Sequence, residues 1–454
     1  MTQLRPNTFG FCGGAYGDEG KGRIVDMVVH QLRKKGEVIV YRDNGGANAG
    51  HTVEFANGQR VAFHQLPSGV FIEGATVVLG KEMVIHPEDL LEELDQINAV
   101  TYTRDRAEIV IDEMALLSLD THRAFEGTLK QWQSGGKGST GRGISPAYAD
   151  VLLRHPLRMR DIIQFNEAKV KQHYDMYAAL VTGLGGELAT SNVVGLNGER
   201  TVGSQAEFIN QLRTSAKKLQ PYIKNVSGWL AEKWADEKCG FVFEKAQAIG
   251  LDYRWGVYPD ITASDTTFDG IFSATEGVID PDLIKFKAGV IKATYMSSVG
   301  TRQLPTIMPE ELAHRIREDA YEYGSTTKRP RGIAYLDLPA LSFFAKVGRI
   351  NTLALTHMDV SYEDVPIKIC VGYKIGKKPA AYRPDQDYLS QVTPIYEELP
   401  SWDVIKLRQA KSYKELPTQA QKFLEFISKK LALPLMMITT GPQREQGLVL
   451  QSLS

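Results

Sequence analysis

The chain has 454 residues, of which 43% are hydrophobic and 24% are charged, and this is the composition of an ordinary soluble globular protein. Its formal net charge of −1 provides no overall field for nucleic acid or an anionic membrane, and no apolar run reaches the roughly 18 residues that span a bilayer. The N-terminus MTQLRPNTF has no apolar signal core, and three widely spaced cysteines favour neither disulfides nor zinc. We expect a cytoplasmic protein that forms a single domain over residues 1–454.

Short apolar strands alternate with amphipathic helices along the whole chain. In the first third, strands are predicted at TFGFCGG, EVIVYRD, ATVVLG and AEIVID. Helices are predicted after residue 23 and at PEDLLEELDQIN, and residues 160–236 read as a mainly helical insertion. Further strands are predicted at CGFVFE, GIAYLDL, NTLALTHMD, PIKICVGYK and LPLMMITTG, with helices at PEELAHRIREDAYEYG and TQAQKFLEFISKKL. This alternation predicts an α/β fold around a mostly parallel central sheet flanked by helices.

The loop GDEGKG, at residues 17–22, joins the first predicted strand to the first helix. Its glycines allow the backbone to approach a ligand, its N–H groups and the helix N-terminus face an anion, and Lys21 adds positive charge. Two carboxylates in such a loop need an explanation, because phosphate oxygens are themselves negative. One could hold Mg²⁺, and one could be a general base toward a second substrate lying against the phosphates. The alternative is a Gly-rich turn without a ligand.

Three further loops suggest anion binding. RDNGGANAGHT (42–52) places His51 where an imidazole could stabilise charge on a leaving diphosphate. SGGKGSTGRGISPAYAD (134–150) combines small residues with a lysine and an arginine. YGSTTKRPRG (323–332) suggests a clamp for a carboxylate or phosphate, since arginine binds such groups in bidentate fashion, although a solvated basic loop is the alternative.

Two apolar strands end in turns that could recognise a purine base. LTHMD (355–359) places a carboxylate just past a strand, where an aspartate can accept the N1–H and 2-amino hydrogens of guanine. ITTGPQR (438–444) also ends a strand, in Gly-Pro. Either could be an ordinary strand-to-loop turn, but their presence beside a phosphate loop favours a base pocket.

Taken together, these motifs resemble the adenylosuccinate synthetase family. From about residue 8 to residue 450 the family's order is matched by G-D-E-G-K-G, N-A-G-H-T, S-T-G-R-G-I-x-P-A-Y, T-T-x-R-x-R, T-x-x-D, E-E-L-P and T-G-P-x-R. The family makes adenylosuccinate from IMP and L-aspartate in AMP biosynthesis, with hydrolysis of GTP to GDP and phosphate, through a 6-phosphoryl-IMP intermediate. The resemblance implies a P-loop-like GTP-binding core with helical insertions, Mg²⁺ as cofactor, and a homodimer.

The resemblance also implies roles for individual residues. Asp18 would remove the N1 proton of the purine and, with the carbonyl of Gly50, would ligate Mg²⁺, while His51 would be the acid toward the diphosphate. Lys21 and Gln247 complete the implied catalytic set. The implied GTP site comprises Gly17, Glu19, Gly20, Gly22, Arg23, Gly50, Thr52, Arg331, His357, Asp359, Thr439 and Gly441. The implied IMP site comprises Asn48, Thr140, Arg154, Gln247, Thr262 and Arg329, with Arg154 reaching the neighbouring subunit's site. The implied aspartate site comprises Ser325, Thr326, Thr327, Arg329 and Arg331.

The chain departs from the family at several positions. His357 stands where a lysine usually covers the guanine ring, Arg254 where an aspartate is usual, and Asp265 where many members have asparagine. The family's E-G-A-Q-G is E-K-A-Q-A here, and this stretch leans toward archaeal and phage members. Some phage relatives act on dGMP and are expected to lack the loop aspartate, so Asp18 favours IMP.

Three alternative functions stay open at this point. The first is a 2-aminoadenylosuccinate synthetase acting on GMP or dGMP. The second is a GTP-binding switch protein, although Gly22 follows Lys21 where such proteins carry a hydroxyl for Mg²⁺. The third is an inactive nucleotide-binding subunit, against which the presence of Asp18, Lys21 and His51 argues.

Overall fold

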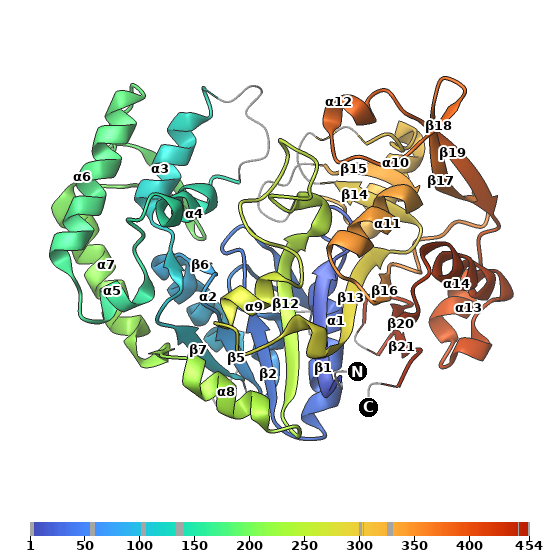
Figure 1. Cartoon of the computed structure of the whole chain (residues 1–454), viewed down its shortest axis with the longest axis horizontal. Coiled ribbons are helices and arrows are strands. Elements are labelled where there is room, and N and C mark those ends of the chain that lie inside the picture. The colour runs from blue at the N-terminus through green and yellow to red at the C-terminus, as the bar shows by residue number, and fades with distance from the viewer. Residues whose placement is uncertain are drawn as a thin grey trace.

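The computed structural model describes residues 4–54, 60–100, 106–132, 140–298, 302, 304–324, 330–443 and 445–452. A ten-stranded sheet crosses the molecule in the order β11-β7-β5-β2-β12-β1-β13-β16-β20-β21 (Figure 1). Every neighbouring pair is parallel except β20 and β21. The predicted α/β fold around a mostly parallel sheet is therefore confirmed.

The strands of this central sheet are, in sheet order, β11 (Ile223–Lys224), β7 (Glu108–Asp112), β5 (Thr76–Leu79), β2 (Val38–Arg42), β12 (Gly240–Ala248), β1 (Arg5–Gly13), β13 (Ile284–Lys292), β16 (Thr352–Thr356), β20 (Leu435–Thr439) and β21 (Gly447–Val449). β2 and β5 are buried at every position, because helices cover both faces of a parallel sheet. Such strands read as unbroken apolar runs, and this is why the sequence revealed them. β13, next to the centre, escaped prediction because three lysines interrupt its IKFKAGVIK.

Helices pack on the central sheet and extend beyond its β11 end. α1 (Lys21–Arg33) buries Ile24, Val25, Met27, Val28 and Leu32, whose helical spacing in the sequence predicted the helix. α2 (Pro87–Val100) begins at its proline, as predicted. The other helices on this side are α3 (Asp120–Leu129), α4 (Ile144–Leu152), α5 (Met159–Ile163), α6 (Glu167–Gly183), α7 (Gln205–Leu219), α8 (Ser227–Ala235) and α9 (Gly270–Ala274).

Residues 160–236 are not entirely helical. The hairpin of β9 (Asn192–Gly195) and β10 (Gly198–Thr201) lies between α6 and α7. The prediction of a mainly helical stretch missed this hairpin, because a two-stranded hairpin of four-residue strands leaves no long periodic pattern. Short pairs also form between β3 (His51–Glu54) and β4 (Arg60–Phe63), and between β6 (Val84–Ile85) and β8 (Leu116–Leu117).

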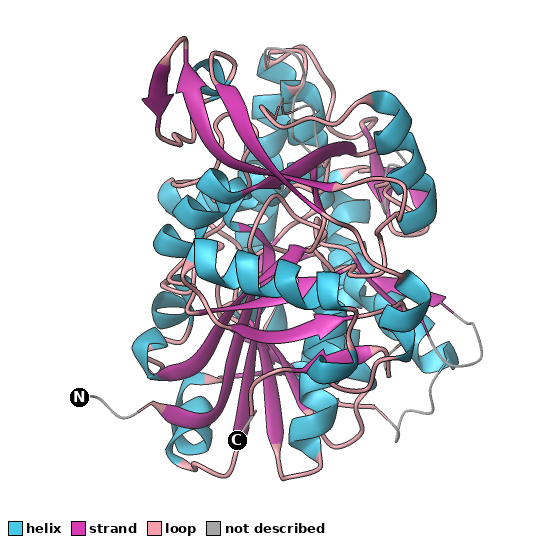
Figure 2. Cartoon of the chain, turned by 90° about the vertical axis from the view of Figure 1, so that its right-hand side faces the viewer, coloured by secondary structure: helices cyan, strands magenta, loops and turns pink. Residues whose placement is uncertain are grey.

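A smaller mixed sheet lies at the β16 side, above the central sheet in Figure 2. It contains β14 (Tyr295–Ser298), β15 (Gly332–Asp337), β17 (Ile367–Ile375), β18 (Lys378–Ala380) and β19 (Thr393–Leu399). The helices of this side are α10 (Glu310–Ala320), α11 (Leu338–Val347), α12 (Gln386–Leu389), α13 (Val404–Gln409) and α14 (Thr418–Leu431). No helix in the described part of the chain is long and apolar enough to cross a membrane. That the whole chain forms one domain stays a prediction.

The parallel strands bring several predicted site loops to one edge. Residue pairing places Gly13 at the end of β1 beside Ala248 at the end of β12, and Lys292 at the end of β13 beside Thr356 at the end of β16. The loops that follow β1, β2, β12, β16 and β20 therefore leave the sheet at its carboxyl edge, where open α/β sheets bind ligands.

Candidate functional site

The loop between β1 and α1 gives its two acidic side chains different positions. The Glu19 side chain is only 3% exposed: Oε1 accepts the Gly17 N–H at 2.6 Å, and Oε2 lies 3.1 Å from Lys21 Nζ. The Asp18 side chain is 29% exposed, on a backbone with φ of 58°. Glu19 is therefore held within the loop by Gly17 and Lys21, whereas the Asp18 carboxylate is partly exposed and lies 2.8 Å from Arg331 Nη2.

Left-handed backbone at Gly20 makes the junction with α1 possible. Gly20 is the N-cap residue of α1 and has φ of 81°, which a residue with a side chain rarely adopts. A Cβ there would lie 3.4 Å from the Thr356 side chain at the end of β16. The Thr356 hydroxyl also donates to the Glu19 carbonyl at 2.6 Å. The phosphate loop is thus fixed against the strand that leads into the predicted base-reading turn.

The loops after β2 and β12 meet around Gln247. Asn44 accepts the Ala246 N–H at 2.9 Å and donates to Ser264 Oγ at 3.0 Å. Gln247 has a left-handed backbone, and its Nε2 is buried without a hydrogen-bond partner. Because an unpaired buried donor costs about 1–3 kcal/mol, this amide indicates a place for an acceptor from a ligand. Asn48, whose Oδ1 accepts the Gly46 N–H at 3.1 Å, belongs to the same loop.

The segment 140–154 approaches these loops through Tyr148. The Gly45 N–H donates to the Tyr148 hydroxyl at 3.2 Å, and that hydroxyl donates to the Glu82 carbonyl at 2.6 Å. Thr140, at the start of the segment, is exposed. Arg154, beyond the end of α4, is exposed as well and has φ of 67°. No contact within the described residues joins Arg154 to this chain's own site loops, and a reach toward another subunit stays a prediction.

The turn after β16 holds His357 and Asp359 in place. The His357 N–H donates to Thr439 Oγ1 at 3.2 Å, and His357 Cε1 lies 3.7 Å from the Cβ position of Gly20. Burial, aided by the nearby Lys292 ammonium, lowers the pKa of His357 to about 4, so the ring is neutral at pH 7. The turn after β16 thus lies against the loop between β1 and α1, and the His357 ring beside that loop is uncharged.

The Asp359 carboxylate and the C-terminal turn are anchored by arginines. Arg408 Nη2 lies 3.0 Å from Asp359 Oδ2. Arg23, on α1, donates to the carbonyls of Gly441 and of Gln446, the latter at 3.0 Å, and burial lowers its pKa to about 10. The structure therefore directs the Arg23 guanidinium to the turn after β20 and not toward the phosphate loop.

Several predicted residues cannot be placed. Ser325, Thr326, Thr327 and Arg329 lie outside the described residues. The backbone of His51 and Thr52 begins β3, but their side chains are outside the described part as well. Thr262 is placed by its N–H, which donates to the Leu251 carbonyl at 2.7 Å.

Three of the residues that depart from the family pattern, Lys245, Arg254 and Asp265, form a charge network with Asp43. The Lys245 ammonium is fully buried against Asp43, and Arg254 Nη1 lies 3.3 Å from Asp265 Oδ2. Burial disfavours the charged ammonium, but Asp43 and Asp265 raise the pKa of Lys245. Lys245 is therefore paired with Asp43, and the unusual Arg254 is paired with the unusual Asp265.

Sequence reasoning missed three charged residues around the site. Arg408 contacts Asp359, and Glu322 and Lys292 form an ion pair behind Arg331. None of them belongs to a glycine-rich loop or a recognisable motif. The only available signal was a charged residue beside a predicted site loop, and that is too common to be selective.

A second cluster, outside these loops, has the residue types of a metal site. His122 Nε2 lies 3.0 Å and His173 Nδ1 3.8 Å from Asp150 Oδ2. However, the Leu119 N–H donates to His122 Nδ1 at 2.9 Å, which places the ring proton on Nε2. That nitrogen donates to Asp150 and offers no lone pair to a cation. The cluster is a hydrogen-bonded network that joins α3, α4 and α6.

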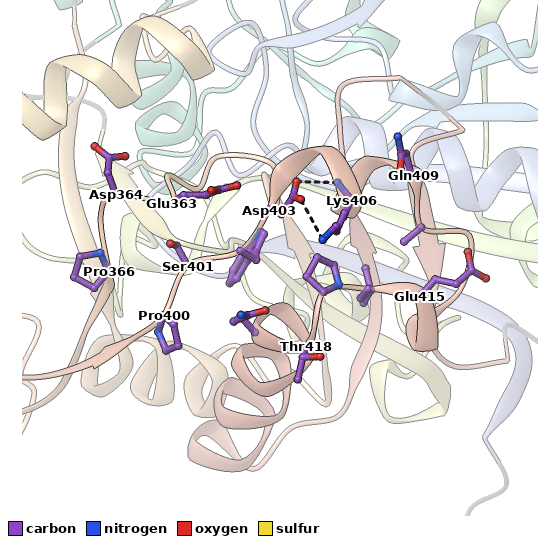
Figure 3. Close-up of a pocket in the computed structure, with 15 residues that line it drawn as sticks. Glu363, Asp364, Pro366, Pro400, Ser401, Asp403, Lys406, Gln409, Glu415 and Thr418 are labelled. Carbon is purple, nitrogen blue, oxygen red and sulfur yellow. Dashed lines mark hydrogen bonds and ion pairs between the residues drawn. The ribbon is translucent and has the colours of Figure 1, made fainter.

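A cavity of about 910 Å³ lies beside α13 (Figure 3). None of the predicted site residues lines it. Its charged lining comprises Glu363, Asp364, Asp403, Glu415 and Lys406. Trp402, which also lines it, donates its indole N–H to the Met358 carbonyl at 2.9 Å. The cavity therefore lies behind the turn that follows β16 and is not part of the predicted site.

A strand, a glycine-rich loop with a lysine, and a helix at the carboxyl edge of a mostly parallel sheet define an α/β nucleotide-binding protein. Comparison with protein families is more specific, because a model described as adenylosuccinate synthetase matches residues 11–448. The chain belongs to the adenylosuccinate synthetase family. Its activity is that of an adenylosuccinate synthetase, a GTP-dependent ligase of purine biosynthesis, as the sequence predicted.

Individual relatives agree with this assignment. The chain is 33% identical over 442 residues to adenylosuccinate synthetase of Acetivibrio thermocellus, covering 96% of this chain and 98% of the relative. It is 33% identical over 448 residues to that of Clostridium botulinum (strain Eklund 17B / Type B), with coverages of 97% and 98%. The structure of fully ligated adenylosuccinate synthetase from Plasmodium falciparum matches with a TM-score of 0.83 and 29% identity, covering 98% of this chain and all of that one.

A more distant structure shares the fold alone. It is the succinoaminodeoxyadenylate synthetase of cyanophage S-2L, bound to dGMP and dATP. It matches with a TM-score of 0.57 and 16% identity, covering 99% of this chain and 96% of that one.

Proposed function

We propose that this chain joins IMP to L-aspartate through a 6-phosphoryl intermediate, with Asp18 as the general base. The observation that carries the assignment is the division of the loop's carboxylates, with Glu19 turned inward and Asp18 outward. Asp18 takes the N1 proton of the purine, and O6 then attacks the γ-phosphorus of GTP. GDP leaves, with His51 as the proposed acid. The aspartate amine next attacks C6, and inorganic phosphate departs.

The donor set at the phosphate loop suits Mg²⁺. Asp18 offers an outward carboxylate and Gly50 a backbone carbonyl, and both are hard oxygen donors of the kind that Mg²⁺ prefers beside phosphate oxygens. Bound there, the ion would neutralise charge on the β- and γ-phosphates. Lys21, at the first position of α1, lies beside the loop and is paired with Glu19.

The loops after β2 and β12 are proposed to bind the monophosphate. The unpartnered Gln247 Nε2 would donate to the purine ring, and Asn48, Thr140, Thr262 and Arg329 would hold the phosphate. Arg331 and the segment that contains Ser325, Thr326 and Thr327 are proposed for aspartate. Gly17, Gly20, Gly22 and Thr52 would contact the GTP phosphates, and Thr439 and Gly441 the guanine.

One assay tests the choice of substrate. Purified protein would be supplied with aspartate, Mg²⁺ and GTP, and with either IMP or dGMP. We expect turnover with IMP and at most a trace with dGMP. A kcat/KM for dGMP equal to or above that for IMP would contradict the proposal and favour a 2-aminoadenylosuccinate synthetase, while GTP hydrolysis that is independent of both monophosphate and aspartate would favour a switch protein.

Arg154 is proposed to complete the monophosphate site of a second copy of the chain. It follows Leu152 and Leu153, which are 85% and 66% exposed, and exposed leucines of this kind suit an interface. Arg154→Leu should raise the KM for IMP about 10-fold or more, because a charged hydrogen bond to phosphate contributes about 1.5–3 kcal/mol. Steady-state kinetics with IMP varied would measure this.

The control for Arg154 is complementation. A mixture of Arg154→Leu with an inactive Asp18→Ala chain contains hybrid dimers with one complete site. Part of the activity should return once the subunits have exchanged. If exchange is demonstrated by labelled subunits and no activity returns, the site is not shared.

His357→Lys should tighten GTP binding without changing the rate of the chemical step. The native imidazole is neutral at pH 7, whereas a lysine would add a cation over the base, which Lys292 and Arg23 oppose and Glu322 and Asp359 favour. A cation beside an aromatic ring contributes about 0.5–1 kcal/mol, or about 2- to 5-fold in Kd. Titration with a non-hydrolysable GTP analogue measures the change, with His357→Gln as the uncharged control. Equal Kd values for the lysine and glutamine variants would show that charge is unimportant there.

A further inference from the structure

Glu322 is a buried carboxylate that belongs to none of the predicted binding sets. Its side chain is 1% exposed. Oε1 accepts the Tyr295 hydroxyl at 2.5 Å and pairs with the Lys292 ammonium, while Oε2 accepts Arg331 Nη1 at 2.7 Å. The second nitrogen of the same guanidinium, Nη2, lies 2.8 Å from Asp18 Oδ2. One arginine therefore joins the buried acid to the outward carboxylate of the phosphate loop.

Contacts of Glu322 and Arg331 also join the described residues that precede and follow residues 325–329. The Arg331 N–H donates to the Glu322 carbonyl at 3.0 Å, and Tyr323 pairs with Pro330 in an antiparallel bridge. Arg331 leads directly into β15, and Glu322 follows α10. Backbone and side-chain contacts thus fix both ends of the proposed aspartate-binding segment at the same place.

The contacts form an alternating row of charges: Lys292, Glu322, Arg331 and Asp18. Burial alone would raise the pKa of Glu322, but Lys292 and Arg331 hold it well below its usual value. Burial likewise opposes the charge on Arg331, but Asp18 and Glu322 raise its pKa. Both groups are therefore ionised at neutral pH. Because the guanidinium is a rigid fork with a carboxylate on each terminal nitrogen, its orientation is set by Glu322 on the buried side.

We propose that Glu322, supported by Lys292 and Tyr295, is a positioning residue for the ligation reaction. It sets Arg331, itself proposed above to bind aspartate, so that the guanidinium holds Asp18 in the orientation from which it meets the purine. The inference rests on the function proposed above for Asp18. Glu322 itself touches neither substrate nor metal.

The test is a double variant that removes the charges of Glu322 and Lys292 together, so that neither is left as an unpaired buried ion. Glu322→Gln keeps the size of the side chain but leaves Lys292 buried without a counterion, which destabilises strongly. Combining it with Lys292→Met restores a neutral pair and leaves Arg331 with Asp18. We expect the double variant to keep a Tm near that of the unmodified chain. Its kcat should fall about 10- to 100-fold and its KM for aspartate should rise, with the KM for IMP little changed, because misplacing a reacting group by about 1 Å has an effect of this size.

Two further variants separate positioning from plain stability. Asp337→Asn removes another buried carboxylate, which accepts the Tyr373 hydroxyl and the Ala340 N–H at 3.2 Å. It should lower the Tm and leave the KM for aspartate unchanged. Tyr295→Phe deletes one hydrogen bond to Glu322 and should shift the KM for aspartate in the same direction as the double variant, by less.

The possible outcomes are distinct. Normal kcat and normal KM for aspartate in a folded double variant would overturn the proposal and leave Glu322 a structural residue. If the double variant does not fold, Tyr295→Phe decides: an unchanged KM for aspartate overturns the proposal and a raised KM supports it. Full activity of Asp18→Ala would instead remove the proposed function, whatever the Glu322 variants show.

Discussion

Asp18→Ala is expected to abolish adenylosuccinate formation while GTP continues to bind. Asp18 is the outward carboxylate of the phosphate loop, and Glu19 cannot replace it, because its oxygens are committed to Lys21 and to the Gly17 N–H. A general base contributes about 10²–10⁴-fold, and loss of a shared metal ligand would add to that. The truncation leaves no buried charge unpaired, since Arg331 keeps its contact with Glu322.

Two measurements separate the loss of chemistry from the loss of binding. Product formation from IMP and aspartate reports the reaction, and titration with a non-hydrolysable GTP analogue reports nucleotide binding. Asp18→Asn is the matched control, because it keeps the shape and polarity of the side chain but cannot take up the N1 proton. It should be nearly as inactive as the alanine variant. Either variant retaining more than about a tenth of the rate would show that another group is the base.

How much of the site could be read from the sequence depended on the range of each interaction. The phosphate loop and the strand-end turns are local: glycines and charged residues stand within a few positions of an apolar strand, and parallel topology then collects them at one edge. The row from Lys292 through Glu322 to Arg331 is not local. It joins the end of β13, the second residue after α10 and the residue before β15, and each residue alone reads as an ordinary charge.

The unusual residues near Gln247 also show that a local partner can be predicted from the sequence and a distant one cannot. Lys245, Arg254 and Asp265 each depart from the family pattern, and read singly they suggested a shift toward other branches. In the structure Arg254 contacts Asp265 and Lys245 contacts Asp43. The pairing of Arg254 with Asp265 could have been predicted from the sequence, because the two residues are eleven positions apart and have opposite charges. The pairing of Lys245 with Asp43 could not, because about two hundred residues separate them. β13 was missed for a related reason, because two of its three lysines, Lys287 and Lys292, are paired with carboxylates in the folded chain.

Asp359 is expected to make GTP the preferred phosphoryl donor. Its carboxylate can accept both the N1–H and the 2-amino hydrogens of guanine, and adenine offers neither donor in that arrangement. Arg408, 3.0 Å from Oδ2, fixes the carboxylate from the side of α13, so the group cannot easily turn away from a mismatched base. A site that would leave a polar group unpaired rejects the wrong ligand strongly. We therefore expect kcat/KM for GTP to exceed that for ATP by at least about 100-fold.

Asp359→Asn should lower this preference by at least about tenfold, because an amide offers one acceptor where the carboxylate offers two and no longer attracts the guanine donors as an anion. The measurement is kcat/KM with GTP, ITP and ATP for both chains. ITP, which lacks the 2-amino group, should lie between the other two for the unmodified chain and approach GTP in the variant. Asp364→Asn, an exposed acid paired with Arg315, is the control that should leave all three ratios unchanged. Similar values for ATP and GTP in the unmodified chain would show that the turn after β16 does not read the base, and that the change from lysine to His357 accompanies a loss of guanine selectivity.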